Sequence, residues 1–313
     1  MQERYEEAAA ALRAAAAASR PDVPAVVTFF PVIFAILAGD FPAADSALVV
    51  LTRRGTPAMQ PDALWYRIIM LRTQGRLRDA LTAAERLATL VSGDGPSTLH
   101  RAQILFELGR FPEAAHVFDS LATFPPAGAV GGRLARHKSW MLAHLATTRA
   151  AAGDLSAFEA LLQPLRAWGA RSAYGRDRRL YHHANGLLLA ARGQLTDAAT
   201  EFQRAIYSPT HGYTRSNYEL ARVYLALGRP RDAVAVLESA LRGPLDASNL
   251  YITRTELQEQ LGRALDAAGE PDQAAVQFQK VLAAWRDADP DFHARREAIR
   301  VRLSRPSRTP SLR

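Results

Sequence analysis

The chain has 313 residues, of which 48% are hydrophobic and 22% charged, which fits one large globular domain or two small ones. Cysteine is absent, which excludes a disulfide framework, a thiolate metal site and a cysteine nucleophile, and fits a reducing compartment such as the cytoplasm. The net charge of +8 has two interpretations: a functional basic face for an anionic partner, or an arginine-rich composition in which only Lys138 and Lys280 are lysine.

The first predicted element is a helix within RYEEAAAALRAAAAASRPD, residues 4–22. Glu3, Glu6 and Glu7 stand where a secretory signal would carry basic residues, so no secretory signal is expected. The next stretch, VPAVVTFFPVIFAILAG at residues 23–39, is the most apolar of the chain. It is shorter than the roughly 20 residues that a membrane span needs, so we predict a buried helix, kinked at Pro31.

Seven short motifs follow at spacings of 34 to 44 residues, from AGDFPAADSAL to AGEPDQAAVQF. Each contains a glycine that can end one helix in a left-handed turn. Five residues after six of these glycines stands an alanine, which lets two helices approach closely, and Phe158 is the exception. Four residues further on comes a large core residue, with Ala84 as the exception. The seven glycines are Gly39, Gly75, Gly109, Gly153, Gly193, Gly228 and Gly269.

These motifs resemble the tetratricopeptide repeat (TPR) family, whose units are helix–turn–helix hairpins of about 34 residues. The family's small residue in the first helix is matched by Gly186, Ala221 and Gly262, each seven positions before a turn glycine. The resemblance implies an all-α, right-handed superhelix of about seven hairpins over residues 21–303, with a C-terminal capping helix. Each hairpin is expected to pack against its neighbours.

Both ends of the chain depart from the repeat. Tyr5, Ala8 and Leu12 have the spacing of a second repeat helix, so residues 1–20 are predicted to be a half-repeat, either downstream of a missing first helix or a lone capping helix. Residues 281–303, VLAAWRDADPDFHARREAIRVRL, resemble the end of TPR regions in bacterial eukaryotic-like Ser/Thr kinases and winged-helix regulators. Residues 304–313 are predicted to form a disordered tail.

Motifs for catalysis or for cofactors are missing. The sequence has no phosphate-binding G-x-x-x-x-G-K-[ST] loop, no G-x-S-x-G elbow and no kinase loops. Asp287, Asp289 and Asp291 begin like a calcium loop, but Phe292 and Ala298 replace its glycine and glutamate, so a polar turn with capping is expected. The eight histidines show no metal-binding pattern. We therefore expect no enzyme, no metal and no cofactor.

The predicted function is a protein–protein interaction scaffold, the regulatory or sensory portion of a bacterial signalling protein. Counting back from the turn glycines places Arg215, Tyr218, Arg222 and Arg263 on inward faces of two adjacent first helices, and His183 on the preceding one. Because arginine binds carboxylates and phosphates bidentately, the expected partner is an acidic peptide in this groove. Two alternatives remain: a helical-repeat protein that binds nucleic acid, and an enzyme without a recognisable motif.

Overall fold

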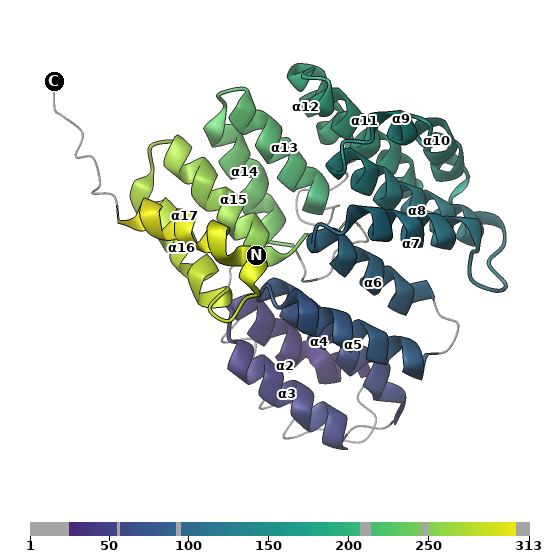
Figure 1. Ribbon diagram of the computed structural model, residues 1–313, viewed down its shortest axis with the longest axis horizontal. Coiled ribbons are helices and arrows are strands. Elements are labelled where there is room, and N and C mark those ends of the chain that lie inside the picture. Colours follow the sequence, from purple (N-terminus) through teal and green to yellow (C-terminus); the bar gives the residue numbers. More distant parts are fainter. Residues whose placement is uncertain are drawn as a thin grey trace.

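A computed structural model describes residues 25–54, 57–91, 95–206, 214–243, 245, 250 and 252–304. The predicted half-repeat at residues 1–20 and nearly all of the predicted tail lie outside these residues. The described part is an all-α solenoid (Figure 1), as predicted. In chain order its helices are α2 (Ala25–Ala38), α3 (Phe41–Arg54), η1 (Pro57–Met59), α4 (Gln60–Thr73), α5 (Leu77–Leu90), α6 (Gly95–Glu107), α7 (Phe111–Thr123), α8 (Gly131–Ala151), α9 (Leu155–Glu159), α10 (Leu162–Arg171), η2 (Gly175–Arg179), α11 (Leu180–Ala191), α12 (Leu195–Ala205), α13 (Thr214–Ala226), α14 (Pro230–Leu241), α15 (Arg254–Ala267), α16 (Pro271–Ala284), η3 (Pro290–Phe292) and α17 (His293–Leu303).

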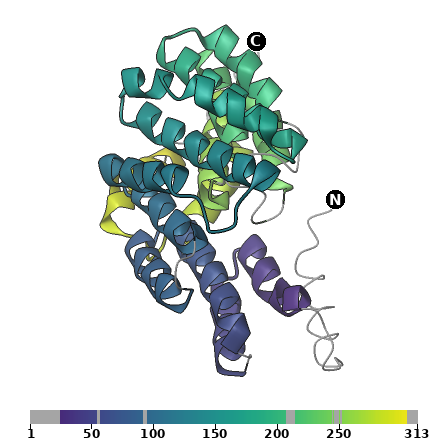
Figure 2. The ribbon, with the colours of Figure 1, turned by 90° about the vertical axis from the view of Figure 1, so that its right-hand side faces the viewer.

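Consecutive helices pair into seven hairpins within the described residues, from α2–α3 to α15–α16. All seven predicted turn glycines have positive φ angles, between 69° and 80°, which confirms their role in ending the first helix of each hairpin. Figure 2 shows how the hairpins succeed one another, with α2 and α3 at one end of the molecule.

The two helices of a hairpin pack closely where a small residue on one helix faces a large side chain on the other. A Cβ atom built on Gly186 would lie 2.9 Å from the Phe202 ring, and one on Gly262 would lie 2.6 Å from the Phe278 ring. A phenylalanine on the second helix therefore takes the space that a side chain on the first helix would need. At Ala84, the exception in the sequence pattern, the corresponding first-helix residue is the fully buried Ile68, so the large and small residues have exchanged places.

The second exception, Phe158, lies in an interrupted helix. Its side chain is completely buried where the other motifs have alanine. The second half of this hairpin is divided into α9, which ends at Glu159, and α10, which begins at Leu162. Pro164, in the first turn of α10, has no N–H group for the carbonyl of residue 160 and would clash with it in a continuous helix, so the helix must break before it.

The apolar segment near the start of the described residues forms α2, which continues through Pro31 without a break in the helix assignment. Phe29, Val32 and Ile36 are buried, as predicted for this stretch. Across the part of the chain that the structure describes, no helix has the length and apolar character needed to span a bilayer.

The C-terminal end of the solenoid touches the second hairpin, α4–α5, a contact that the expected packing of each hairpin against its neighbours does not include. The Asp289 amide donates to the Gly75 carbonyl at 3.0 Å, and the Asp289 carboxylate accepts from the Arg78 amide at 2.9 Å. The predicted polar turn therefore caps α5, more than two hundred residues away, and not its own helix. Thr255 Oγ1 also donates to the Thr73 carbonyl at 2.7 Å.

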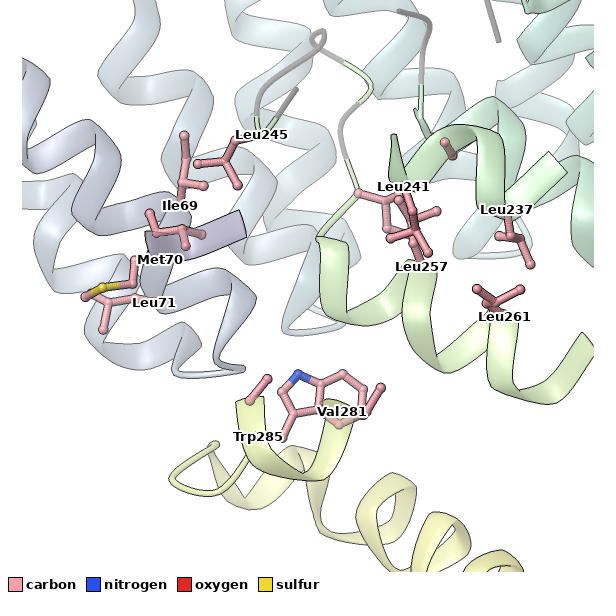
Figure 3. Packing of buried hydrophobic residues seen from close by; sticks show 14 of the residues in the cluster. Ile69, Met70, Leu71, Leu237, Leu241, Leu245, Leu257, Leu261, Val281 and Trp285 are labelled. Carbon is pink, nitrogen blue, oxygen red and sulfur yellow. The ribbon is translucent and has the colours of Figure 1, made fainter. Parts of the chain in front are cut away.

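The same closure is visible in the hydrophobic core. One cluster joins residues from α2–α5 with residues from α12–α17, including Ile69, Leu245 and Trp285 (Figure 3). Figure 1 shows α16 and α17 beside the turn between α4 and α5. A second cluster fills the middle hairpins, α6 to α11, and also takes in Leu250. The solenoid is therefore closed by packing as well as by hydrogen bonds.

A glycine substitution tests the closure. Gly75 and Gly109 have similar φ angles, +69° and +71°, but a Cβ on Gly75 would lie 2.9 Å from Ala288 whereas one on Gly109 meets nothing within 4 Å. Gly75→Ala should lower the free energy of unfolding by about 1–3 kcal/mol more than Gly109→Ala, because only the first overpacks the contact. Urea unfolding of both variants measures this difference, and equal losses would contradict the closure.

A second pair of variants tests the repeat register. Ala233 is completely buried at the small-residue position of α14, whereas Ala157 is one position out of register and only half-buried. Ala233→Leu should destabilise the chain by about 1–3 kcal/mol, and Ala157→Leu by less. Thermal unfolding by circular dichroism compares them. A larger loss for Ala157→Leu would show that the register is assigned wrongly.

Candidate functional site

The face predicted to bind a ligand lies on α13 and α15. Tyr218 and Arg222 on α13 come together with Arg263 on α15, and around them are three carboxylates that the sequence analysis did not single out: Glu219, Glu256 and Glu259. Tyr218 is half-buried against the hydrophobic cluster that joins the two ends. We call this set, with Arg295 of α17, the α13–α15 face.

The arginines of this face are held by buried carboxylates beneath them. Arg222 Nη1 donates to Glu219 at 2.9 Å, and Arg263 Nη2 donates to Glu259 at 2.7 Å. The two carboxylate side chains are only 11% and 4% exposed, whereas Arg222 and Arg263 are 59% and 47% exposed. The guanidinium groups therefore stand at the surface in fixed positions. The Glu219 charge accordingly raises the pKa of Arg222.

Arg295 of α17 closes one side of the face. It donates through Nε to Glu259 at 3.1 Å and lies 3.6 Å from Glu256. Its guanidinium also sits 4.5 Å from the centre of the Trp285 ring, a cation–π contact. Although burial opposes its charge, the two carboxylates raise the pKa of Arg295. α17 is thereby fixed to α15 by ion pairs, to which Arg302 and Asp266 add another.

Tyr218 keeps its phenolic proton in this setting. Burial, followed by the charges of Glu256 and Glu219, raises the pKa of Tyr218 to about 12. The hydroxyl group is therefore available as a hydrogen-bond donor at any physiological pH.

Arg215 turns away from this face toward the middle hairpins. Its guanidinium lies 4.8 Å from the centre of the Phe106 ring, and its amide donates to the Leu250 carbonyl at 3.0 Å. It borders a small polar hollow beside the buried ion pair of Arg72 and Glu107, whose Nη2 and Oε1 atoms are 2.6 Å apart. Arg215 therefore belongs to an internal polar layer, not to the α13–α15 face.

His183 is completely buried, so its predicted place in an open groove is wrong. Thr147 Oγ1 donates its hydrogen to the Ala143 carbonyl at 2.8 Å, and must therefore accept from His183 Nε2 at 3.3 Å. His183 Nδ1 then accepts from Ser216 Oγ at 2.9 Å. Both ring nitrogens are satisfied in the neutral form. Burial, with a contribution from the Arg215 charge, lowers the pKa of His183 to about 3.

The sequence contained a signal for two of the missed carboxylates. Glu256, Glu259 and Arg263 stand at the same three distances before Gly269 as Arg215, Tyr218 and Arg222 stand before Gly228. Counting all positions, rather than arginines and aromatic residues alone, would have found them. Arg295 gives no such signal because no turn glycine follows α17.

Family models agree with these hairpins. Residues 71–129 match one tetratricopeptide repeat model, and residues 215–239 and 256–280 match a second. The chain contains tetratricopeptide repeats. The matched segments cover α5 to α7 and most of the hairpins α13–α14 and α15–α16, whereas the hairpins α2–α3 and α11–α12 and the segment from α8 to α10 lie largely outside them. A search of curated proteins gave no match.

Solved structures with a similar arrangement have low sequence identity. A tetratricopeptide repeat protein from Parabacteroides merdae is 16% identical, with 89% of this chain and 97% of that chain covered and a TM-score of 0.46. A monomeric mutant of IFIT1 with Gppp-AAAA is 14% identical, with coverages of 95% and 68% and a TM-score of 0.48. The TPR2AB domain of yeast Sti1 in complex with pHSP90 is 13% identical, with coverages of 79% and 100% and a TM-score of 0.33.

The buried histidines make stability depend on pH. His100 also has a pKa lowered to about 3, by burial and by Arg72. Below the ordinary histidine pKa of 6.5 these two histidines are protonated in the unfolded chain but stay neutral in the folded chain. The free energy of unfolding therefore falls as the pH drops from 6.5 toward 3. Each histidine contributes a slope of about 1.4 kcal/mol per pH unit in this window.

His183→Asn should remove the contribution of His183 to the slope of the unfolding free energy against pH between pH 5 and 6.5. This holds whatever the substitution does to stability at pH 7. Urea unfolding at closely spaced pH values gives the slope. A slope that matches the wild type would show that His183 is protonated in the folded protein.

Proposed function

We propose that this chain is a non-catalytic protein–protein interaction scaffold that binds an acidic peptide segment on the α13–α15 face. Tetratricopeptide repeats serve as such scaffolds, which supports the general statement. The observation that favours this face is the exposure of Arg222 and Arg263 above their buried carboxylate partners.

These two arginines have donors to spare. A guanidinium carries five N–H groups, and among the described residues Arg222 and Arg263 each use one, toward Glu219 and Glu259. The remaining donors face outward, where an acidic side chain can accept them. The Tyr218 ring adds a flat contact for the peptide backbone. Because the buried glutamates already hold the guanidinium groups, little side-chain entropy is lost on binding.

We further propose that the scaffold is the regulatory or sensory portion of a bacterial signalling protein. The support is the resemblance of residues 281–303 to the ends of TPR regions in Ser/Thr kinases and winged-helix regulators. This part of the proposal rests on the sequence alone.

Charge substitution tests the peptide site. The probe is a fluorescent oligoglutamate peptide, and binding is followed by anisotropy at several salt concentrations. Arg222→Gln with Arg263→Gln should weaken binding roughly ten-fold or more, since two charge-assisted contacts are lost. The matched control is Arg86→Gln with Arg231→Gln, which removes the same charge from exposed positions on second helices. Equal weakening by both pairs would reject the α13–α15 face.

A further inference from the structure

A second cationic site lies between α10, α11 and α12, away from the α13–α15 face. A hollow of about 410 Å³ opens there. This volume is within the range of small-ligand pockets in proteins. Figure 1 shows the three helices together, next to the interrupted hairpin of α9 and α10. We call it the α10–α12 pocket; its lining residues are Arg166, Ala170, Arg178, Tyr181, His182, Asn185, Glu201 and Arg204.

The single carboxylate of the pocket holds two of the lining side chains in place. Glu201 Oε2 lies 2.8 Å from His182 Nδ1, and Glu201 Oε1 accepts from Arg204 at 2.7 Å. Burial alone would raise the pKa of Glu201, but hydrogen bonds from His182, Asn185 and Arg204 hold it below its usual value. Because an ionised carboxylate can only accept, His182 Nδ1 carries the hydrogen of that contact. Glu201 thus fixes the imidazole and one guanidinium at the pocket wall.

The other two arginines have no such compensation. Arg166 and Arg178 are exposed, and among the described residues no carboxylate forms an ion pair with either one. Arg166 lies 5.4 Å from the centre of the Tyr181 ring, which holds its guanidinium against the wall. The pocket therefore contains three guanidinium groups and an imidazole against one carboxylate.

The surrounding sequence concentrates positive charge at this place. Residues 131–181 contain nine basic and three acidic residues, a net charge of +6 out of +8 for the whole chain. Residues 292–313 carry an equal net charge of +6, so two segments of the chain are strongly basic. The first surrounds α8, α10 and η2, and the pocket lies at its edge. The location points to an anionic ligand.

We propose that the α10–α12 pocket binds a phosphoryl group carried on a peptide side chain. A phosphoryl group carries close to two negative charges and three acceptor oxygens, so it can use several guanidinium groups around one hollow better than a single carboxylate can. The hollow leaves room for the side chain that bears the phosphoryl group. The site lies outside the α13–α15 face and does not depend on the function proposed for that face.

A nucleic-acid strand fits these observations less well. Proteins that bind single strands combine a basic groove with open aromatic rings on which bases stack. Here arginines of the chain itself already occupy one face of the rings in the basic segment. Arg136 lies 4.0 Å from the Trp140 ring centre and 3.7 Å from that of Tyr174, and Arg171 lies 4.6 Å from that of Trp168.

The test uses an immobilised degenerate peptide library with a central phosphoserine and the same library after phosphatase treatment. The full chain should be retained by the phosphorylated library at least about ten-fold better. Free O-phosphoserine should compete if the phosphoryl group is what is recognised. Arg166→Gln with Arg178→Gln should abolish the preference, and the control pair Arg86→Gln with Arg231→Gln should leave it intact.

Three outcomes would overturn the proposal: equal retention by both libraries, a preference that survives loss of Arg166 and Arg178, or displacement by a single-stranded RNA oligomer at a lower concentration than by O-phosphoserine. The pair Arg222→Gln and Arg263→Gln should not change phosphopeptide retention. Failure at one site is therefore distinguishable from failure at the other.

Discussion

The contact between the C-terminal turn and the turn of the α4–α5 hairpin is the constraint on which the rest of the architecture depends. In an open solenoid each hairpin touches only its neighbours, and its curvature is free to vary. Here Asp289 bonds to Gly75 and Arg78, so the intervening hairpins must bring α17 back to α5. The total rotation of the array is thereby fixed, and one hydrophobic cluster spans both ends.

The closed array separates two kinds of charged surface. On the α13–α15 face, buried glutamates neutralise the arginines and hold them in place, so the face is ordered but locally balanced in charge. In the α10–α12 pocket the single buried glutamate, Glu201, pairs with only one of the three arginines, which leaves a positive excess. The first arrangement favours recognition by shape and hydrogen bonds, and the second favours attraction of a compact anion.

Periodic features of this structure could be predicted from the sequence, and singular ones could not. The turn glycines recur in all seven hairpins of the described residues and the buried alanines in six, so their positions are visible as a repeat. The hydrogen bond between the Arg78 amide and the Asp289 carboxylate occurs once and joins distant segments, so the repeat pattern does not predict it. His183 shows the same limit within the repeat. It shares its register with Tyr218, but its neighbours Thr147 and Ser216 enclose it completely. The repeat position of a residue predicts which side of its helix it lies on. Whether the side chain is buried depends on the residues of the neighbouring helices.

The matched volumes inside each hairpin restrict how such an array can be recombined. The first helix with Gly186 accepts a phenylalanine opposite it, whereas the first helix with Ile68 accepts only alanine. A crossover within a hairpin that joined Ile68 to a phenylalanine helix would create a clash, and one that joined Gly186 to the Ala84 helix would leave a void. Duplication or exchange of whole hairpins preserves the pairs. The hairpin, not the single helix, is therefore the unit that can be exchanged without repacking the contact.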